Sequence, residues 1–295
     1  MQIGIAGMGR MGAAMAARLM ELGHHVTVWN RSADKAKSIA EAGAAVAASP
    51  AELTKNAEII LTILTDAAAI DAVYGGPSGL LSGDVKGKLF IEMSTVQPET
   101  EVDVAKKVQA KGASFLDCPV GGSVGPARQG RLIGMAGGDG ADFERARPLL
   151  EQLCRRVELF GPVGAGASMK LAINLPLMIY WQAFGEALSL CQHLNVDPLR
   201  MMDLFSDTSG GTNALKVRGP TIAMMLDGRD PGPTTFDIAS SCKDLRTMLA
   251  EGKRRGVQLP LIERALACYE EAASNGWAQR DGSMMPVYWS RRGRN

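Results

Sequence analysis

Three glycines near the N-terminus have the spacing of a phosphate-binding turn. Gly7, Gly9 and Gly12 form a G-x-G-x-x-G pattern between a short apolar stretch, residues 1–6, and a helical stretch, residues 13–22. The first glycine makes the tight turn, the second lets the backbone approach a pyrophosphate, and the third lets the helix pack on the strand. The helix N-terminus offers N–H groups and a positive dipole end to the phosphates. The pattern predicts a dinucleotide site; a glycine-rich turn without a ligand is the alternative. The candidate residues are Gly7, Met8, Gly9, Arg10, Met11 and Gly12.

The residues after the second predicted strand indicate which dinucleotide binds. Asn30, Arg31 and Ser32 follow residues 25–29, and no acid stands at this strand tip. An acid would bond the ribose 2′-hydroxyl and repel a 2′-phosphate, whereas Arg31 can bind that phosphate by a charge-assisted contact. We therefore expect NADP(H) to be preferred, with NAD(H) as an alternative cofactor. In the competing interpretation, Arg31 is a surface arginine that stacks on the adenine of either cofactor.

Two further strand ends carry candidate cofactor contacts. Ser94 and Thr95 follow the predicted strand 89–92, and small hydroxyls there suit a loop that faces a nicotinamide. Capping of the next helix by Ser94 or Thr95 is an equal alternative, and both roles can hold. Leu64 and Thr65, at the end of the predicted strand 59–64, are also expected to contact the cofactor. In the loop after residues 89–92, Thr95 is the residue that we expect to contact the cofactor.

A second glycine-rich loop, residues 117–130, has the composition of an anion-binding turn. Gly121, Gly122 and Ser123 are followed by a further glycine, and their backbone N–H groups could cradle a carboxylate. A bare turn is the alternative. We expect these three residues to bind the acid group of a small substrate.

A lysine early in a long apolar helix is the candidate acid–base group. Lys170 follows the glycine-rich loop 161–166, and Asn174 lies four residues further on the same helical face. A lysine at this end of a helix opposes the dipole preference, and its surroundings could lower its pKa enough for acid–base chemistry. A lone lysine is usually a solvated surface residue. The amide and the glycine loop favour the catalytic interpretation.

The overall composition gives no reason to expect nucleic acid or a membrane as a partner. The chain has 295 residues, 46% of them hydrophobic and 21% charged, and a formal net charge of +1. Polar residues interrupt its most apolar stretch, residues 171–190, so a buried helix explains that stretch better than a membrane span. Five scattered cysteines without a C-x-x-C pair indicate reduced thiols, and no metal site is expected. No secretory signal precedes the first strand, so we expect a cytoplasmic location.

The elements that must position these residues change character along the chain. Seven short β-branched stretches alternate with helical stretches in the first half: residues 3–6, 25–29, 59–64, 89–92, 114–118, 133–137 and 154–160. This alternation predicts a parallel sheet covered on both faces. From about residue 165 the pattern is helical: residues 167–194, 198–206, 215–225, 240–255 and 260–275. Pro198 suits the first position of its helix after Asp197 as N-cap, and Pro176 predicts a kink or break.

The predicted fold class is therefore an α/β Rossmann-type dinucleotide-binding domain followed by an all-α C-terminal domain, joined by a long helix. We place an NADP-binding domain at residues 1–163 and a helical domain for substrate binding and oligomerisation at residues 164–295.

These motifs, in this order, resemble the β-hydroxyacid dehydrogenases, the family of 3-hydroxyisobutyrate dehydrogenase and tartronate semialdehyde reductase. The resemblance covers nearly the whole chain. Residues 7–16 are similar to the family's cofactor signature, and residues 117–130 to its substrate-binding segment. Lys170 matches the catalytic lysine and Asn174 its associated asparagine. Lys243, in a late Lys-Asp motif, matches a lysine near the cofactor and substrate.

The substrate-binding segment departs from the family pattern, which usually reads Asp-Ala-Pro-Val-Ser-Gly-Gly. Gly121 stands at the serine position, Ser123 follows two residues later, and Pro126 stands at the following glycine position. Ser123 is therefore the candidate replacement for the usual serine.

The resemblance implies reversible hydride transfer between a nicotinamide and a small β-hydroxy acid or its semialdehyde or ketone. Lys170 would be the general acid–base group, and family members form dimers or tetramers. An imine-reductase-like NADPH enzyme is one alternative, although such enzymes usually replace the lysine. A 6-phosphogluconate-type enzyme would need a longer helical domain and more phosphate-binding cations. A non-catalytic NADP-binding sensor is a third alternative. The lysine–asparagine pair argues against it.

Overall fold

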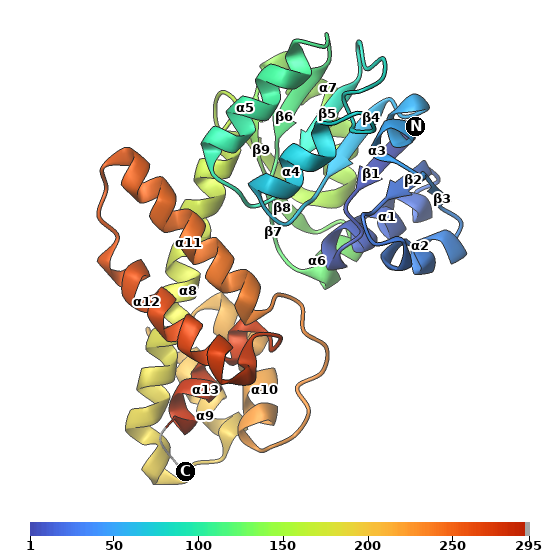
Figure 1. Ribbon diagram of the computed structural model, residues 1–295. Coiled ribbons are helices and arrows are strands. Elements are labelled where there is room, and N and C mark those ends of the chain that lie inside the picture. The colour runs from blue at the N-terminus through green and yellow to red at the C-terminus, as the bar shows by residue number, and fades with distance from the viewer. Residues whose placement is uncertain (293–295) are drawn as a thin grey trace. The chain divides into compact units, whose positions relative to one another are not determined.

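The computed structural model describes residues 1–292. Its residues group into two compact units, Met1–Leu171 and a second that begins at Ala172 (Figure 1). The long helix α8 (Ala165–Cys191) contributes residues to both units. The predicted boundary between residues 163 and 164 stays a prediction.

The first unit contains all the described strands. They are β1 (Gln2–Ala6), β2 (His25–Trp29), β3 (Ala45–Val46), β4 (Ile59–Thr62), β5 (Leu89–Glu92), β6 (Ser114–Asp117), β7 (Val120–Gly121), β8 (Leu132–Gly138) and β9 (Cys154–Leu159). They pair in the order β3-β2-β1-β4-β5-β6-β8-β7, and β9 pairs with β8. All seven predicted strands are confirmed. The sequence pattern missed β3 and β7 because two residues are too few to show a period.

The sheet is mixed, which corrects the expectation of a purely parallel one. Strands β1 to β6 run parallel, and so do β8 and β9, whereas β8 is antiparallel to β6 and β7. The chain reverses between β7 and β8 through the short helix α6 (Val124–Arg128). Hydrophobic alternation reports which faces are buried but carries no information about strand direction, so this reversal was not predictable from it.

Helices cover both faces of the sheet, as predicted. On one face the core holds residues of α1 (Arg10–Glu21), α2 (Lys37–Glu41) and α7 (Gly140–Leu153). On the other it holds residues of α3 (Pro50–Lys55), α4 (Ala67–Tyr74) and α5 (Pro98–Gln109). Strands β4 and β5 are buried at every position, which is typical of parallel strands between two helical layers.

Four neighbouring strands end in one register row. Ala6 of β1 pairs with Thr62 of β4, Thr62 with Glu92 of β5, and Glu92 with Asp117 of β6. The loops after these parallel strands therefore leave the same edge of the sheet, where ligands bind in open α/β folds.

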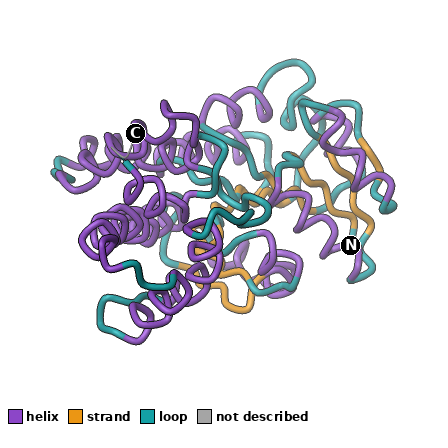
Figure 2. The backbone as a smooth tube through the Cα atoms, turned by 90° about the horizontal axis from the view of Figure 1, so that it is seen from below, coloured by secondary structure: helices purple, strands orange, loops and turns teal. Residues whose placement is uncertain are grey.

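The regular elements described in the second unit are helices; Figure 2 draws all helices in purple. After α8 come α9 (Pro198–Asp207), α10 (Asn213–Leu226), α11 (Ile238–Arg255), α12 (Pro260–Ala272) and α13 (Met285–Arg291). Asp197 caps α9 by accepting from the Arg200 N–H at 2.8 Å, as predicted. Helix α8 runs through Pro176, so of the predicted kink or break the break is wrong. The seven-residue α13 was missed. Within residues 1–292, no helix combines the length and hydropathy that crossing a membrane requires.

Candidate active site

The glycine turn after β1 has the three mechanical properties expected of it. Gly7 has φ +106°, and a Cβ there would lie 2.2 Å from the Ile63 carbonyl oxygen. A Cβ on Gly12 would lie 1.9 Å from the Gly7 carbonyl oxygen, so α1 packs on the turn only without a side chain. A Cβ on Gly9 would have no atom within 4 Å. The fold thus requires Gly7 and Gly12 for its own packing, whereas the space at Gly9 is open.

The N-terminus of α1 can accept an anion. Gly9 is its N-cap, no side chain caps it, and its first turn contains no acidic residue. N–H groups and the dipole of a helix N-terminus stabilise a phosphate at such a position. This chemistry fits the pyrophosphate of a dinucleotide.

Asn30 ties the glycine turn to the tip of β2. Its Oδ1 accepts from the Met8 N–H at 2.9 Å, and its Nδ2 donates to the Ser32 carbonyl oxygen at 2.9 Å. Arg31 and Ser32 are exposed beside it. The structure therefore gives Asn30 a role in holding the turn, and leaves the side chains of Arg31 and Ser32 accessible to a ligand.

A buried hydrogen-bond network joins the loops after β4 and β5. The Leu64 N–H donates to Ser94 Oγ at 2.7 Å, and Ser94 donates from both its N–H and its hydroxyl to Glu92 Oε1. Gln97 is the N-cap of α5, and its side chain makes no capping hydrogen bond. Neither Ser94 nor Thr95 therefore stands at the N-cap position of this helix. Thr65 is exposed and Thr95 half-buried.

Glu92 is a central residue of this network that the sequence reasoning did not assign. It is fully buried, and its Oε2 accepts from Thr62 Oγ1 at 2.5 Å, while Thr62 also bonds to Tyr74 at 2.8 Å. Burial raises the pKa of Glu92 to about 7, although the Ser94 and Thr62 donors act in the opposite direction. The sequence signal that could have identified Glu92 is an acid at the end of an otherwise apolar strand.

Lys170, in helix α8, contacts the glycine-rich segment that follows β6. Only 8% of its surface is exposed, and Nζ donates to the Val120 carbonyl oxygen at 2.7 Å. Val120 directly precedes Gly121, Gly122 and Ser123, so the structure brings the predicted acid–base group to the predicted acid-binding loop. Gly122 has φ +125°, and a Cβ there would lie 2.8 Å from Leu132 Cδ2, so this position requires glycine.

The second unit links Asn174 and Lys243 through a buried carboxylate. Asn174 Nδ2 donates to Asp244 Oδ2 at 3.3 Å, and Lys243 Nζ lies 2.5 Å from Asp244 Oδ1. Asp244 is only 1% exposed. Helical spacing pointed to Asn174 and the family resemblance to Lys243, but neither gave a role to Asp244, which contacts both.

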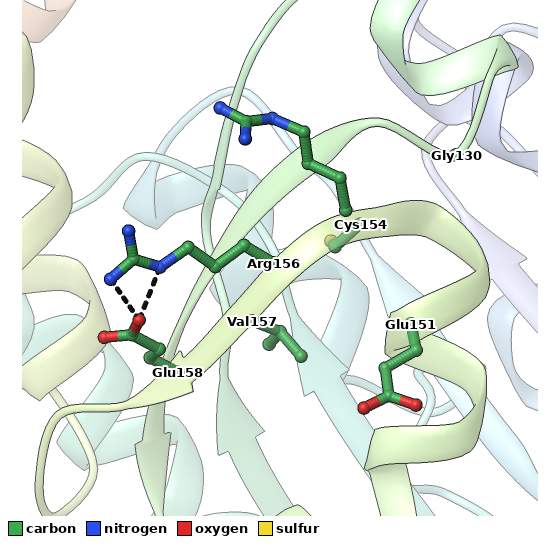
Figure 3. A pocket seen from close by; sticks show the side chains of 7 residues that line it. Gly130, Glu151, Cys154, Arg156, Val157 and Glu158 are labelled. Carbon is green, nitrogen blue, oxygen red and sulfur yellow. Dashed lines mark hydrogen bonds and ion pairs between the residues drawn. The ribbon is translucent and has the colours of Figure 1, made fainter.

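The candidate residues do not line the surface cavity shown in Figure 3. That cavity, with a volume of about 470 Å³, lies at β9 and is lined by residues such as Cys154, Arg156 and Glu158. An ion pair between Arg156 and Glu158 is marked there by dashed lines. A second cavity, lined by residues such as Met20, His25 and Arg128, also contains none of the candidates.

Comparison with known proteins places the chain in the class of oxidoreductases that bind a nicotinamide dinucleotide. Residues 2–161 match the NAD binding domain of 6-phosphogluconate dehydrogenase, and residues 164–288 match the NAD-binding domain of NADP-dependent 3-hydroxyisobutyrate dehydrogenase. The chain belongs to the β-hydroxyacid dehydrogenase family. It is an NAD(P)-dependent dehydrogenase or reductase that acts on CH–OH groups.

Individual relatives agree with this assignment. Glyoxylate/succinic semialdehyde reductase 1 of Arabidopsis thaliana is 35% identical over 284 residues, which cover 96% of each chain. The structure of Mycobacterium tuberculosis 3-hydroxyisobutyrate dehydrogenase with L-serine is 28% identical, with a TM-score of 0.84 and 97% and 98% coverage. The structure of Psf3 in complex with NADP+ and 2-OPP is 26% identical, with a TM-score of 0.86 and 97% and 99% coverage.

Proposed function

We propose that this protein is an NADP-dependent reductase that interconverts a small β-hydroxy acid and its semialdehyde or ketone. Lys170 is the general acid–base group. The observation that carries the proposal is the buried Lys170 ammonium, held 2.7 Å from the Val120 carbonyl at the start of the Gly121–Ser123 loop. A buried cation beside a loop rich in backbone N–H groups suits a substrate that has both a carbonyl and a carboxylate.

Residues 1–163 hold the cofactor in this proposal. The glycine turn and the N-terminus of α1 bind the pyrophosphate, and Asn30, Arg31 and Ser32 bind the adenosine end. Arg31 selects the 2′-phosphate because a guanidinium forms charge-assisted hydrogen bonds to phosphate. Leu64, Thr65 and Thr95, in loops at the same sheet edge, complete the cofactor contacts. The nicotinamide, when bound, supplies or accepts the hydride.

The side chains supply proton transfer and orientation. In reduction, Lys170 Nζ donates a proton to the carbonyl oxygen, and in oxidation it accepts the hydroxyl proton. The N–H groups of Gly121, Gly122 and Ser123 bind the acid group. Asn174 orients the reacting oxygen or the lysine, and Asp244 fixes its amide. Lys243 adds positive charge for substrate and cofactor binding, so the helical residues 164–295 contribute to substrate recognition.

Glyoxylate and succinic semialdehyde are the first substrates to test, because they appear in the name of the Arabidopsis relative. We also propose that the helical domain forms a homodimer or homotetramer. Large apolar side chains on several of its helices are exposed, among them Ile173, Leu190, Leu204, Val217 and Leu261. An interface between copies of the chain would remove such apolar surface from water.

The test is a panel of small semialdehydes and keto acids assayed with NADPH and with NADH, on wild type and Lys170→Ala. We expect NADPH-dependent turnover in wild type, and a kcat lower by about 10²–10⁴-fold in the variant with unchanged NADPH binding. Lys107→Ala is the matched control, because Lys107 pairs with Asp71 on the surface. NADPH binding without turnover of any substrate would favour the sensor, and turnover only with an added amine would favour an imine-reductase-like enzyme.

A further inference from the structure

Asp117 is a fully buried carboxylate with no role in the proposed chemistry. It is the last residue of β6, where it pairs in register with Glu92 of β5 and Gly137 of β8. A carboxylate in such a position is stable only when hydrogen-bond donors replace the lost water.

Those donors are backbone N–H groups at the N-terminus of α8. The Gly164 N–H donates to Asp117 Oδ1 at 2.7 Å, and the Ala167 N–H donates to Oδ2 at 2.8 Å. Helix α8 begins at Ala165, so the carboxylate occupies the end where helix N–H groups are unsatisfied and the dipole is positive. Asp117 thus caps α8 from a strand that lies 47 to 50 residues earlier in the chain.

The backbone of two glycines lies close to this carboxylate. A Cβ on Gly137 would lie 2.4 Å from Asp117 Oδ1, and a Cβ on Gly166 would lie 2.9 Å from Oδ2. Both glycines therefore allow the strand and the helix to approach the acid closely.

The same short segment also contacts α8 at a second point. Val120, three residues after Asp117, accepts the hydrogen bond from Lys170 Nζ. Residues 117–120 therefore hold the first two turns of α8 at both the helix N-terminus and the lysine. The acid-binding residues Gly121, Gly122 and Ser123 continue directly from this segment.

We propose that Asp117 is a positioning residue for the reaction: its ionised carboxylate anchors the start of α8 and thereby fixes Lys170 against the acid-binding loop. This inference rests on the proposed function of Lys170 and goes beyond it. Small displacements of an acid–base group are expensive, since a misplacement of about 1 Å can cost about 10²-fold in rate.

The charges around Asp117 give this anchor a pH dependence. Glu92 faces it from β5, Glu101 from α5, Lys170 lies further along α8, and the neighbouring Cys118 stays protonated because burial raises its pKa. Burial raises the pKa of Asp117 to about 6, while the N–H groups of Gly164, Ala167 and Gly166 act to lower it. The anchor is therefore complete above about pH 6 and is lost as pH falls below that value, since protonation removes an acceptor.

The experiment compares Asp117→Asn with wild type. An asparagine oxygen can accept from only one of the two N–H groups, and its amide then faces the other. We expect kcat to fall by about 10²-fold with little change in NADPH binding, and the acidic limb near pH 6 to disappear from the kcat profile. Asp139→Asn is the control, because Asp139 caps α7 in the same way through the Ala141 N–H and should leave both kcat and profile unchanged.

Backbone hydrogen exchange separates this inference from the proposed function. Exchange at residues 164–167, corrected for intrinsic rates, should rise in Asp117→Asn, and in wild type when the pH falls from 7 to 5. The wild-type measurement stands even if the variant does not fold. Wild-type kcat and pH profile in Asp117→Asn, or unchanged wild-type protection at pH 5, would overturn the inference. Turnover unaffected by Lys170→Ala would instead overturn the proposed function.

Discussion

Two helices of the first unit begin in glycine-rich turns, and their N-termini are used in opposite ways. At α1 no side chain caps the helix, its first turn is free of acids, and the space at Gly9 is open. At α8 the N-terminus is filled by the buried carboxylate of Asp117, which accepts from the Gly164 and Ala167 N–H groups. The positive dipole end of α1 therefore suits an external anion, whereas that of α8 is occupied by a carboxylate of the protein itself.

This difference shows why a glycine-rich turn before a helix is not by itself a ligand site. The ligand-binding end must leave its N–H groups and the space in front of them available. At the other end an internal acid already accepts hydrogen bonds from the start of the helix that carries Lys170. The two ends can be told apart experimentally by substitutions that affect only one of them.

The largest expected effect comes from a methyl group at Gly12. In Gly12→Ala the new Cβ would lie 1.9 Å from the Gly7 carbonyl oxygen, so α1 must move away from the turn. We expect the free energy of unfolding to fall by about 3 kcal/mol, as for severe overpacking. Urea denaturation monitored by circular dichroism measures this. Wild-type stability would mean that α1 does not pack on the turn as described.

The neighbouring Gly9→Ala should separate binding from folding. Its Cβ would meet no protein atom within 4 Å, so the free energy of unfolding should stay near that of wild type. The methyl group would instead occupy the space where the pyrophosphate approaches, and a clash of about 1–3 kcal/mol raises the Kd for NADPH by about 5- to 150-fold. Fluorescence titration measures the Kd, and unchanged NADPH affinity would contradict the assignment of this end as the phosphate site.

Arg31→Ala tests which anion the α1 side of the sheet selects. Loss of a charge-assisted hydrogen bond, worth about 1.5–3 kcal/mol, should raise the KM for NADPH by about 10- to 10²-fold. The KM for NADH should change little, because NADH lacks the 2′-phosphate. Equal losses for both cofactors would instead support stacking of Arg31 on the adenine.

Glu101 provides a contrast with Asp117, because it is buried without donors. Neither of its carboxyl oxygens has a hydrogen-bond partner among residues 1–292. Burial, and then the charges of Glu92 and Asp117, raise its pKa well above the usual range. Because the pKa is higher folded than unfolded, Glu101 takes up a proton on folding, and its contribution to stability declines as pH rises from about 4.5.

Glu101→Met should therefore stabilise the protein, by about 1–3 kcal/mol, and more at pH 8 than at pH 5. Urea denaturation at the two pH values measures the gain. A loss of stability, or a gain that is larger at pH 5, would show that the Glu101 carboxyl has a stabilising role.

The smallest effect is expected for Gly121→Ser, which restores the serine usual in the family. A Cβ at Gly121 would make only ordinary contacts, 3.6 Å from Met135 Cε and 3.8 Å from Ile133 Cβ. We expect a change in stability within about 0.5 kcal/mol and an altered KM for the acid substrate with unchanged NADPH binding. A large loss of stability would show that this loop cannot accept the family's side chain.

Much of the fold was predictable because hydrophobic period and glycine spacing are local signals. The apolar stretches predicted all seven longer strands and the helical second half, and the G-x-G-x-x-G turn indicated a dinucleotide-binding domain. The antiparallel β8 was not predictable, since strand direction depends on how the chain returns after β7. The long helix at residues 167–194 was predicted, and α8 continues through Pro176 without the local break that this proline could have caused.

The candidate residues, too, could be identified only where the sequence carries a local signal. Lys170 and Asn174 could be found from their helical spacing, and Gly121–Ser123 from loop composition. The buried acids Asp117 and Asp244 could not, because their partners lie 47 to 70 residues away and a lone acid at a strand end or inside a helix has no spacing signature. Their contacts became apparent only in the folded structure.

Backbone hydrogen exchange with and without NADPH tests the contrast between the two helix N-termini most directly. NADPH should increase protection at residues 8–13, at the open end of α1, whereas residues 164–167 should already be protected without it because Asp117 caps them. Protection by NADPH at residues 164–167 but not at residues 8–13 would contradict the account.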